Sequence, residues 1–107
     1  MSDKDLALVM KDGMNLLHVK KQTPEICLAA VRQNGEALRF VKNQTEEICI
    51  TAIKWACYDA LRYVKEQTEE ICLVAVTKNS LAMKYVKDKT PKIWEAAIES
   101  YKRDMTL

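Results

Sequence analysis

The sequence predicts an all-α fold, a short α-solenoid of about four and a half helical hairpins with a 22–23 residue repeat. One observation is a repeated residue pair, found at Gln22-Thr23, Gln44-Thr45, Gln67-Thr68 and, as a variant, Lys89-Thr90. Successive pairs are 22, 23 and 22 residues apart. A second observation is that only two glycines and two prolines occur in 107 residues, a composition that favours helices. Units this short bury their apolar faces only against neighbours, so we expect them to stack in one row.

The chain is long enough for one hydrophobic core, and we expect a single helical-repeat domain over residues 1–107. Its units cover approximately residues 1–21, 22–43, 44–66, 67–88 and 89–107. A net charge of +2 is too small to indicate nucleic-acid or membrane binding by itself. The N-terminal apolar stretch is too short and interrupted for a signal peptide, and no run of about 18 apolar residues suggests a membrane span. These features predict a cytoplasmic protein that does not bind membranes.

The first helix of each unit is predicted from its start and end signals. In residues 22–43, QTPEICLAAVRQNGEALRFVKN, Thr23 is placed to cap a helix and Pro24 suits its first turn. The helix should run to about Asn34, and Gly35 should end it. The same cap position recurs at Thr45, Thr68 and Thr90. We therefore expect four equivalent helix starts.

A second, shorter helix is predicted from the segment EALRFVK, so each unit should be a helical hairpin. The apolar stripe of the first helix comprises Ile26, Cys27, Ala30 and Val31. Its alanine recurs as Ala52, Ala75 and Ala97. A small residue at this fixed place permits neighbouring helices to approach closely. The core should be completed by residues of the second helix, namely Ala37, Leu38, Val41 and their equivalents.

The two terminal units depart from the pattern. At the start, Lys4 and Asp5 replace the Ile-Cys pair, and Ser2 with Asp5 gives a capping-box-like helix start. In the last unit, Trp94 and Glu95 replace the cysteine and the leucine. Because the ends of a solenoid must present polar surface to water, we expect these units to be the caps of a complete small protein.

Three cysteines, Cys27, Cys49 and Cys72, occupy the same position in successive units. Stacked helices lie about 10 Å apart, too far for a disulfide, so these thiols should be reduced core residues. Cys57 lies in an irregular insertion and can be exposed. With no CxxC pair and a single histidine, His18, we expect neither a metal site nor another cofactor.

The segment QTPEICLAAVRQNGEALRFVKNQTEEIC resembles the helical repeats gathered under domain of unknown function 4116, which are known from large DNA viruses, phages and bacteria. The resemblance covers nearly the whole chain. It implies a helical-repeat fold without an established enzymatic activity. The strongest departure is in the third unit, where WACYD replaces the QNGE turn and adds one residue.

Comparison of the units with one another separates a constant frame from variable positions. The positions of Arg32, Gln33 and Glu36 vary between units, which is typical of a binding face and also of an unconstrained solvent face. Trp55 is the strongest candidate anchor, because its position otherwise holds Lys, Gln or Ser. The alternative is that the insertion lengthens the helix and folds Trp55 over its own core. The candidate partner-binding residues are Trp55, Tyr58, Arg32, Lys54 and Lys78.

A repeated row of basic residues is an alternative site, for phosphate groups. Its members are Arg39, Lys42, Arg62, Lys65, Lys84 and Lys87, preceded by Lys20 in the first unit. The row is accompanied by three aromatic residues on which bases could stack, Phe40, Tyr63 and Tyr85. A parallel acidic row consists of Glu25, Glu46, Glu47, Glu69 and Glu70. Salt bridges between units, or solvated faces, explain both rows more simply than nucleic acid does.

The sequence offers little for catalysis. We expect His18 to be partly buried, and neither a paired nucleophile nor a glycine-rich phosphate loop occurs. We expect a non-enzymatic protein that binds a protein partner through a rigid surface, as a viral or phage inhibitor or adaptor acting in the host cytoplasm would. One alternative is a nucleic-acid-binding module that uses the basic row. Another is a self-associating structural protein, a homo-oligomer joined through Met105, Leu107 and the final unit or through the region of Trp55.

Overall fold

The computed structural model describes residues 3–106, and within this range the chain is all-α, with α-helices alternating with short 3₁₀ helices. The α-helices are α1 (Asp3–Lys11), α2 (Pro24–Gln33), α3 (Glu46–Trp55), α4 (Glu69–Lys78) and α5 (Pro91–Met105). The 3₁₀ helices are η1 (Gly13–His18), η2 (Gly35–Phe40), η3 (Tyr58–Tyr63) and η4 (Ser80–Tyr85). Ser2 and Leu107, to which the sequence assigns a capping box and a self-association contact, lie outside the described residues.

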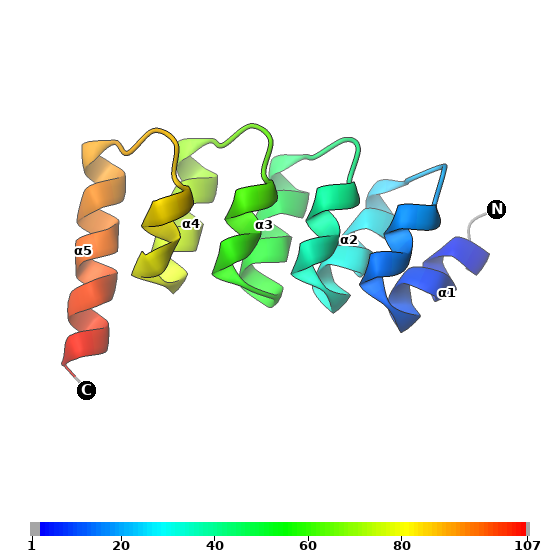
Figure 1. The fold of residues 1–107 in the computed structure, drawn as a ribbon, viewed down its shortest axis with the longest axis horizontal. Coiled ribbons are helices and arrows are strands. Elements are labelled where there is room, and N and C mark those ends of the chain that lie inside the picture. The colour runs from blue at the N-terminus through cyan, green and yellow to red at the C-terminus, as the bar shows by residue number, and fades with distance from the viewer. Residues whose placement is uncertain (1–2, 107) are drawn as a thin grey trace.

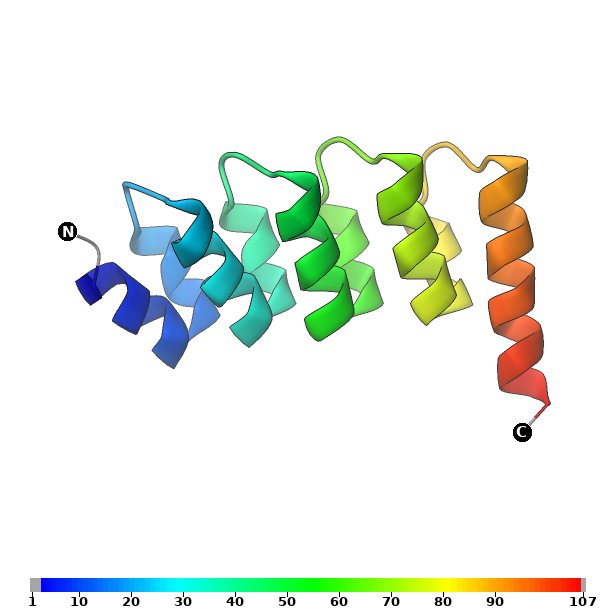
Figure 2. The ribbon, with the colours of Figure 1, turned by 180° about the vertical axis from the view of Figure 1, so that it is seen from behind.

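The hairpins stack in one row, as the repeat predicts. Within residues 3–106, each helix contacts only the helices of its own unit and of the neighbouring units. The α-helices form one layer and the 3₁₀ helices the other, with the two chain ends at opposite ends of the row (Figures 1 and 2). The row measures 48 × 28 × 16 Å. The predicted all-α helical-repeat architecture is therefore confirmed.

The repeated threonines cap the α-helices as predicted. Thr23 has an extended backbone and its hydroxyl oxygen accepts a hydrogen bond from the Ile26 N–H at 3.2 Å. The same bond recurs in the later units, at 3.2 or 3.3 Å, from Thr45, Thr68 and Thr90. An N-cap side chain satisfies one of the four backbone N–H groups that a helix start leaves without a partner. Each unit therefore begins its α-helix at a fixed residue.

The turn between the two helices of a unit is made differently from the prediction. Asn34, with φ of −155°, ends α2, and its side-chain oxygen then accepts the Glu36 N–H at 3.0 Å to start η2. The second helix is a 3₁₀ helix that ends at Phe40, before Val41. Asp12 and Asn79 begin η1 and η4 by the same bond. The predicted end of the first helix at about Asn34 is confirmed, but the residue that makes the turn is Asn34 and not Gly35.

The glycines serve close packing, since neither has a positive φ. A Cβ atom at Gly35 would lie 2.5 Å from the Cβ of Ala56 in the next unit. A Cβ atom at Gly13 would overlap the backbone oxygen of Ala30. Glycine at these two positions therefore lets the end of the following α-helix approach the turn.

The core lies between the two layers and runs through the units. Ile26, Cys27, Ala30 and Val31 are buried as predicted, and so are the recurring alanines. The 3₁₀ helices contribute Ala37 and Leu38 and their equivalents, with Met83 only half-buried. Cys27, Cys49 and Cys72 are buried free cysteines, whereas Cys57 is exposed.

The glutamine that precedes each cap threonine closes the hairpin of its own unit, because its side chain binds the end of that unit's 3₁₀ helix. The Gln44 side-chain amide donates to the Tyr63 backbone oxygen at 3.0 Å and accepts the Lys65 N–H at 2.9 Å. Gln22 and Gln67 clamp the ends of η2 and η4 in the same way. In the last unit Lys89 replaces the glutamine, and its ammonium donates to the Val86 oxygen within the preceding turn. The repeated Gln-Thr pair is visible in the sequence, but its spacing predicts a role only for the threonine.

Candidate functional site

Trp55 is the last residue of α3, and its side chain is 66% exposed. Helix α3 has ten residues, like α2 and α4, so the inserted residue does not lengthen it. The insertion instead forms a turn through Ala56, whose φ and ψ are −113° and −74°. The alternative that Trp55 folds over its own core is therefore wrong, and the indole lies on the surface.

At the position of Trp55, the side chains of the second, third and fourth units each contact the unit before. For Trp55 the contact is the Arg32 guanidinium, 5.6 Å from the ring centre. At the same position, Gln33 accepts the Gly13 N–H at 2.6 Å, and the Lys78 ammonium donates to the Ile53 oxygen at 2.7 Å. Different residues at this position therefore join the units by different contacts. The sequence alone could not distinguish this from drift on a solvent-exposed surface.

Four of the five predicted partner-binding residues lie on one surface. Arg32 stacks on Trp55, Lys54 precedes Trp55 in α3, and the Lys78 ammonium donates to the Lys54 oxygen at 2.8 Å. We call these four residues the Trp55 surface. Tyr58 is not part of it, because its side chain is half-buried and packs against the core from η3.

A shallow apolar groove of about 510 Å³ adjoins the Trp55 surface. It is lined by Lys54 of α3 and by α4 residues Glu70, Leu73, Val74, Thr77 and Lys78. Leu73 and Val74 are half-buried, so they form a floor that a partner's apolar side chain could cover. Of its charged lining residues, Lys54 and Lys78 are basic and Glu70 is acidic, so the net charge of the lining is positive. The arrangement suits an apolar side chain accompanied by acidic groups.

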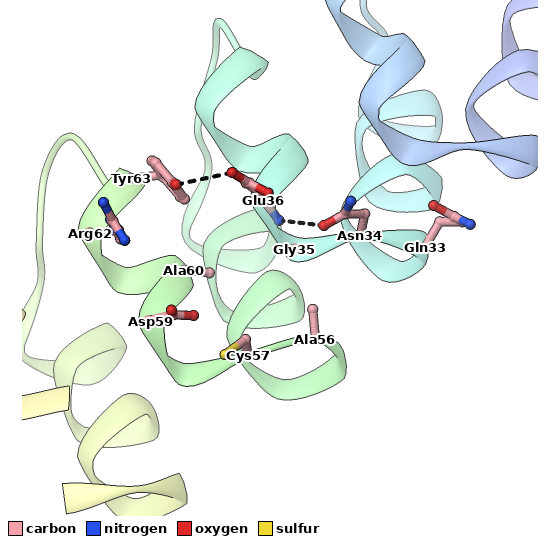
Figure 3. A pocket seen from close by; sticks show the side chains of 10 residues that line it. All are labelled: Gln33, Asn34, Gly35, Glu36, Ala56, Cys57, Asp59, Ala60, Arg62 and Tyr63. Atoms are coloured by element: carbon pink, nitrogen blue, oxygen red, sulfur yellow. Dashed lines mark hydrogen bonds between the residues drawn. The ribbon is translucent and has the colours of Figure 1, made fainter. Parts of the chain in front are cut away.

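A second pocket, of about 380 Å³, lies on the other side of the insertion, between η2 and η3 (Figure 3). The Tyr63 hydroxyl donates to a Glu36 carboxylate oxygen at 3.4 Å beside it. The Cys57 thiol lines this pocket, and its pKa is raised, mainly by a hydrogen bond with Asp59. A thiol with a raised pKa is a weak nucleophile at neutral pH. The pocket therefore lacks the activated thiol that covalent chemistry would need.

The basic row forms a ladder of stacked side chains along the 3₁₀ layer. The Arg39 guanidinium lies 5.3 Å from the ring centre of Phe40 and 5.6 Å from that of Tyr63 in the next unit. Arg62 repeats this arrangement with Tyr63 and Tyr85, at 5.3 and 5.7 Å. Lys84 lies over Tyr85 at 5.3 Å. The rings that could stack on bases are therefore already in contact with cations of the chain itself.

The repeated lysines lie outside the 3₁₀ helices, each after the valine that ends the helix, so they do not share a helical face with Arg39 or Arg62. Two of them reach back to the preceding turn. The Lys42 ammonium donates to the Lys20 oxygen at 3.4 Å and the Lys65 ammonium to the Val41 oxygen at 3.5 Å. These bonds give part of the basic row a structural role. Lys87 is exposed.

Two members of the acidic row, Glu46 and Glu69, pair with threonines of the next unit and not with the basic row. A Glu46 carboxylate oxygen accepts the Thr68 hydroxyl at 2.8 Å, and Glu69 accepts that of Thr90 at the same distance. Within residues 3–106, the one ion pair closer than 4 Å joins Arg39 to Glu36 of the same unit. The interpretation of the two rows as ladders of salt bridges between units is therefore wrong.

Other candidate chemistry is weak in the part of the chain that the structure describes. His18, the last residue of η1, is exposed, contrary to the expectation of partial burial. Among the described residues, no three His, Cys, Asp or Glu side chains converge as metal ligands would. No described helix is both long and apolar enough to cross a membrane.

Comparison with known proteins adds no assignment. No protein-family model matches this chain, and neither a curated protein nor a solved structure matches it.

Proposed function

We propose that this protein is a non-enzymatic helical-repeat module that binds a protein partner through the Trp55 surface. The observation that carries the proposal is the 66% exposed indole of Trp55, fixed at the end of α3. Exposed tryptophan and arginine are the side chains most enriched among energetically dominant interface residues. A stacked hairpin frame holds them with little conformational freedom to lose on binding.

The surface indicates the chemistry of the partner. Arg32 places positive charge on the indole, Lys54 and Lys78 place it on one part of the groove edge while Glu70 lies on another, and Leu73 and Val74 offer apolar contact. A partner that presents an apolar side chain next to aspartates or glutamates would complement both features. A viral or phage inhibitor or adaptor that covers such a surface on a host protein, in the host cytoplasm, is the form of this proposal that the resemblance of the repeats supports.

Affinity capture with matched variants tests the proposal. Wild type, Trp55→Ala and Leu17→Ala are immobilised and exposed to the same cell extract, and the retained proteins are identified and quantified. Leu17 is 59% exposed on η1, far from Trp55, and therefore controls for the loss of exposed apolar surface. We expect a partner retained by wild type and Leu17→Ala but lost from Trp55→Ala. Equal retention by all three would contradict the assignment.

The alternative, nucleic-acid binding by the basic row, is less well supported because the aromatic rings of that row are half-buried as well as covered by guanidinium groups, whereas Trp55 is 66% exposed beside Arg32. Salt dependence separates the two functions. Phosphate contacts would weaken steeply as salt rises, and replacing Lys42, Lys65 and Lys87 by Glu would abolish them. Binding at the Trp55 surface should survive both changes, with only a modest loss from its charged rim.

A further inference from the structure

An apolar stripe runs along the exposed side of α5, the helix at the C-terminal end of the row (Figure 1). Its members are Trp94, Ile98, Tyr101 and Met105, which are 48%, 49%, 57% and 67% exposed. We call these four residues the α5 stripe. The expectation of a polar cap is met by Glu95, which is exposed, but not by these side chains.

Internal units show what normally covers these positions. The residues of α4 that correspond to Trp94 and Ile98 are Cys72 and Val76, which are 2% and 0% exposed. Helix α4 is covered by η4 of its own unit and by α5 of the next. Within the described residues, α5 is followed neither by a 3₁₀ helix of its own unit nor by a further α-helix. At both positions α5 carries a larger side chain than α4 does. Larger apolar groups at uncovered positions indicate that the stripe meets another surface.

The spacing of the stripe is that of a helix-pairing seam. Its members are separated by four, three and four residues, the alternation that defines the two apolar positions of a heptad repeat. Helix α5 has fifteen residues, against ten in α2, α3 and α4, so it presents two heptads. The other α-helices keep the length that their hairpins need. The added turns of α5 extend the seam.

The stripe is complementary to a second copy of itself in antiparallel orientation. A two-fold axis between Ile98 and Tyr101 places each of these residues opposite the other, and places Trp94 opposite Met105. The same axis brings Glu95, on the flank of the stripe, beside Lys102 of the second copy. By symmetry, Lys102 of the first copy lies beside Glu95 of the second, so the dimer contains this pair twice. Both side chains are exposed in the single chain. A parallel pair would bring neither charge near its opposite.

From this spacing and charge pattern we propose that the α5 stripe is the interface of an antiparallel homodimer. The partner at this end of the solenoid is then a second copy of the chain, whose α5 takes the place that the next unit occupies elsewhere in the row. This interface is separate from the Trp55 surface and does not depend on the function proposed for it. The dimer would present two Trp55 surfaces.

Sedimentation equilibrium of the full chain, from about 1 μM to about 500 μM, tests the dimer. We expect wild type to change from the mass of one chain to that of two, and Ile98→Asp to stay monomeric. Leu81→Asp, at an equally apolar and 59% exposed position on η4, should dimerise like wild type. Circular dichroism confirms that each variant is folded. A wild type that stays monomeric, or a folded Ile98→Asp that dimerises, would overturn the proposal.

Charge reversal tests the orientation. Glu95→Lys or Lys102→Glu alone places like charges together twice, so each should raise the dissociation constant about fivefold. Combining the two substitutions restores opposite charges and should return the constant to within about twofold of wild type. If the double variant dimerises more weakly than either single variant, the antiparallel pairing is wrong.

Discussion

Single residues in this chain often satisfy two neighbours at once. The Thr68 hydroxyl oxygen accepts the Ile71 N–H at 3.2 Å, while its hydrogen is donated to Glu46 at 2.8 Å. The first bond starts a helix and the second joins two units. Thr90 repeats the arrangement with Glu69. A cap in the middle of the row is therefore also part of the contact between units.

Replacing Thr45 by Ala should lower the free energy of unfolding by about 1 kcal/mol, because the Ile48 N–H loses its partner. Thr68→Ala should cost more, since Glu46 loses a donor as well. Urea denaturation measures both. Thr77→Ala, an exposed position inside α4, is the control and should be close to neutral. A Thr45→Ala variant as stable as wild type would exclude the cap.

Burial determines the pKa and the reactivity of the cysteine thiols. It raises the pKa of Cys27 and Cys72, and burial together with the nearby Glu46 carboxylate raises that of Cys49 to about 11. Cys57 is exposed. At pH 8 a thiol reagent should therefore modify one cysteine in the folded chain and four after denaturation. Cys57→Ala should remove the fast reaction, and rapid modification of a second thiol would show that the core opens readily.

The same shift affects stability at high pH. The folded pKa of Cys49 lies above the value of 9.0 expected for an unperturbed thiol, so the unfolded chain loses this proton first. Its contribution to stability is complete below pH 9 and should decrease as pH rises from about 9 towards about 11.

At the scale of the helices, one amide side chain, that of Gln44, bonds to the second helices of two units. Gln44 makes two bonds with the end of η3 and one, at 3.1 Å, with the Leu38 oxygen of η2. It thus joins the second helices of two units. In the last unit Lys89 replaces the glutamine, and its ammonium donates to the Val86 oxygen. Gln22 and Gln67 bind only within their own units, so the bond to a second unit is particular to Gln44.

Gln44→Ala should lower the free energy of unfolding by roughly 1–3 kcal/mol, since the Tyr63 oxygen and the Lys65 N–H lose the amide and the bond from Gln44 to the Leu38 oxygen of η2 is lost as well. Asn43→Ala removes an amide from the adjacent, exposed position and should change stability little. Equilibrium denaturation of both variants makes the comparison. Equal effects of the two substitutions would show that the amide does not join the units.

The sequence predicts the α-helices of this chain better than it predicts the 3₁₀ helices. Threonine caps and the apolar stripe are local signals, and they specify where each α-helix starts and which side it buries. The segment Gly35–Phe40 has an ordinary helical composition. Its 3₁₀ form is accompanied by the side-chain bond of Asn34 at its start and by the clamp from Gln22 at its end. The second of these joins residues eighteen positions apart, which no local pattern reveals.

At the scale of the whole molecule, the period of the repeat predicts the row of hairpins, but it does not predict which side chains meet at the Trp55 surface. Arg32 and Trp55 belong to consecutive units, and only stacking brings the guanidinium to the indole. The sequence identified both as candidates without placing them together. The stacked structure also shows that a variable position is structural. Lys78 donates to a backbone oxygen of α3, and Gln33 accepts the N–H of the first residue of η1.

Trp55 should therefore contribute little to stability and much to binding. Its contact with Arg32 is an exposed cation–π pair, so Trp55→Ala should lower the free energy of unfolding by no more than about 1 kcal/mol. Urea denaturation measures this loss. A larger loss would mean that the indole mainly holds two units together.

The most direct measurement is isothermal titration of the captured partner with wild type, Leu17→Ala and Trp55→Ala, each shown to be folded. Binding through the Trp55 surface predicts that Trp55→Ala weakens the complex at least about tenfold while Leu17→Ala stays within about twofold of wild type. Equal affinities for all three proteins would contradict recognition at this surface.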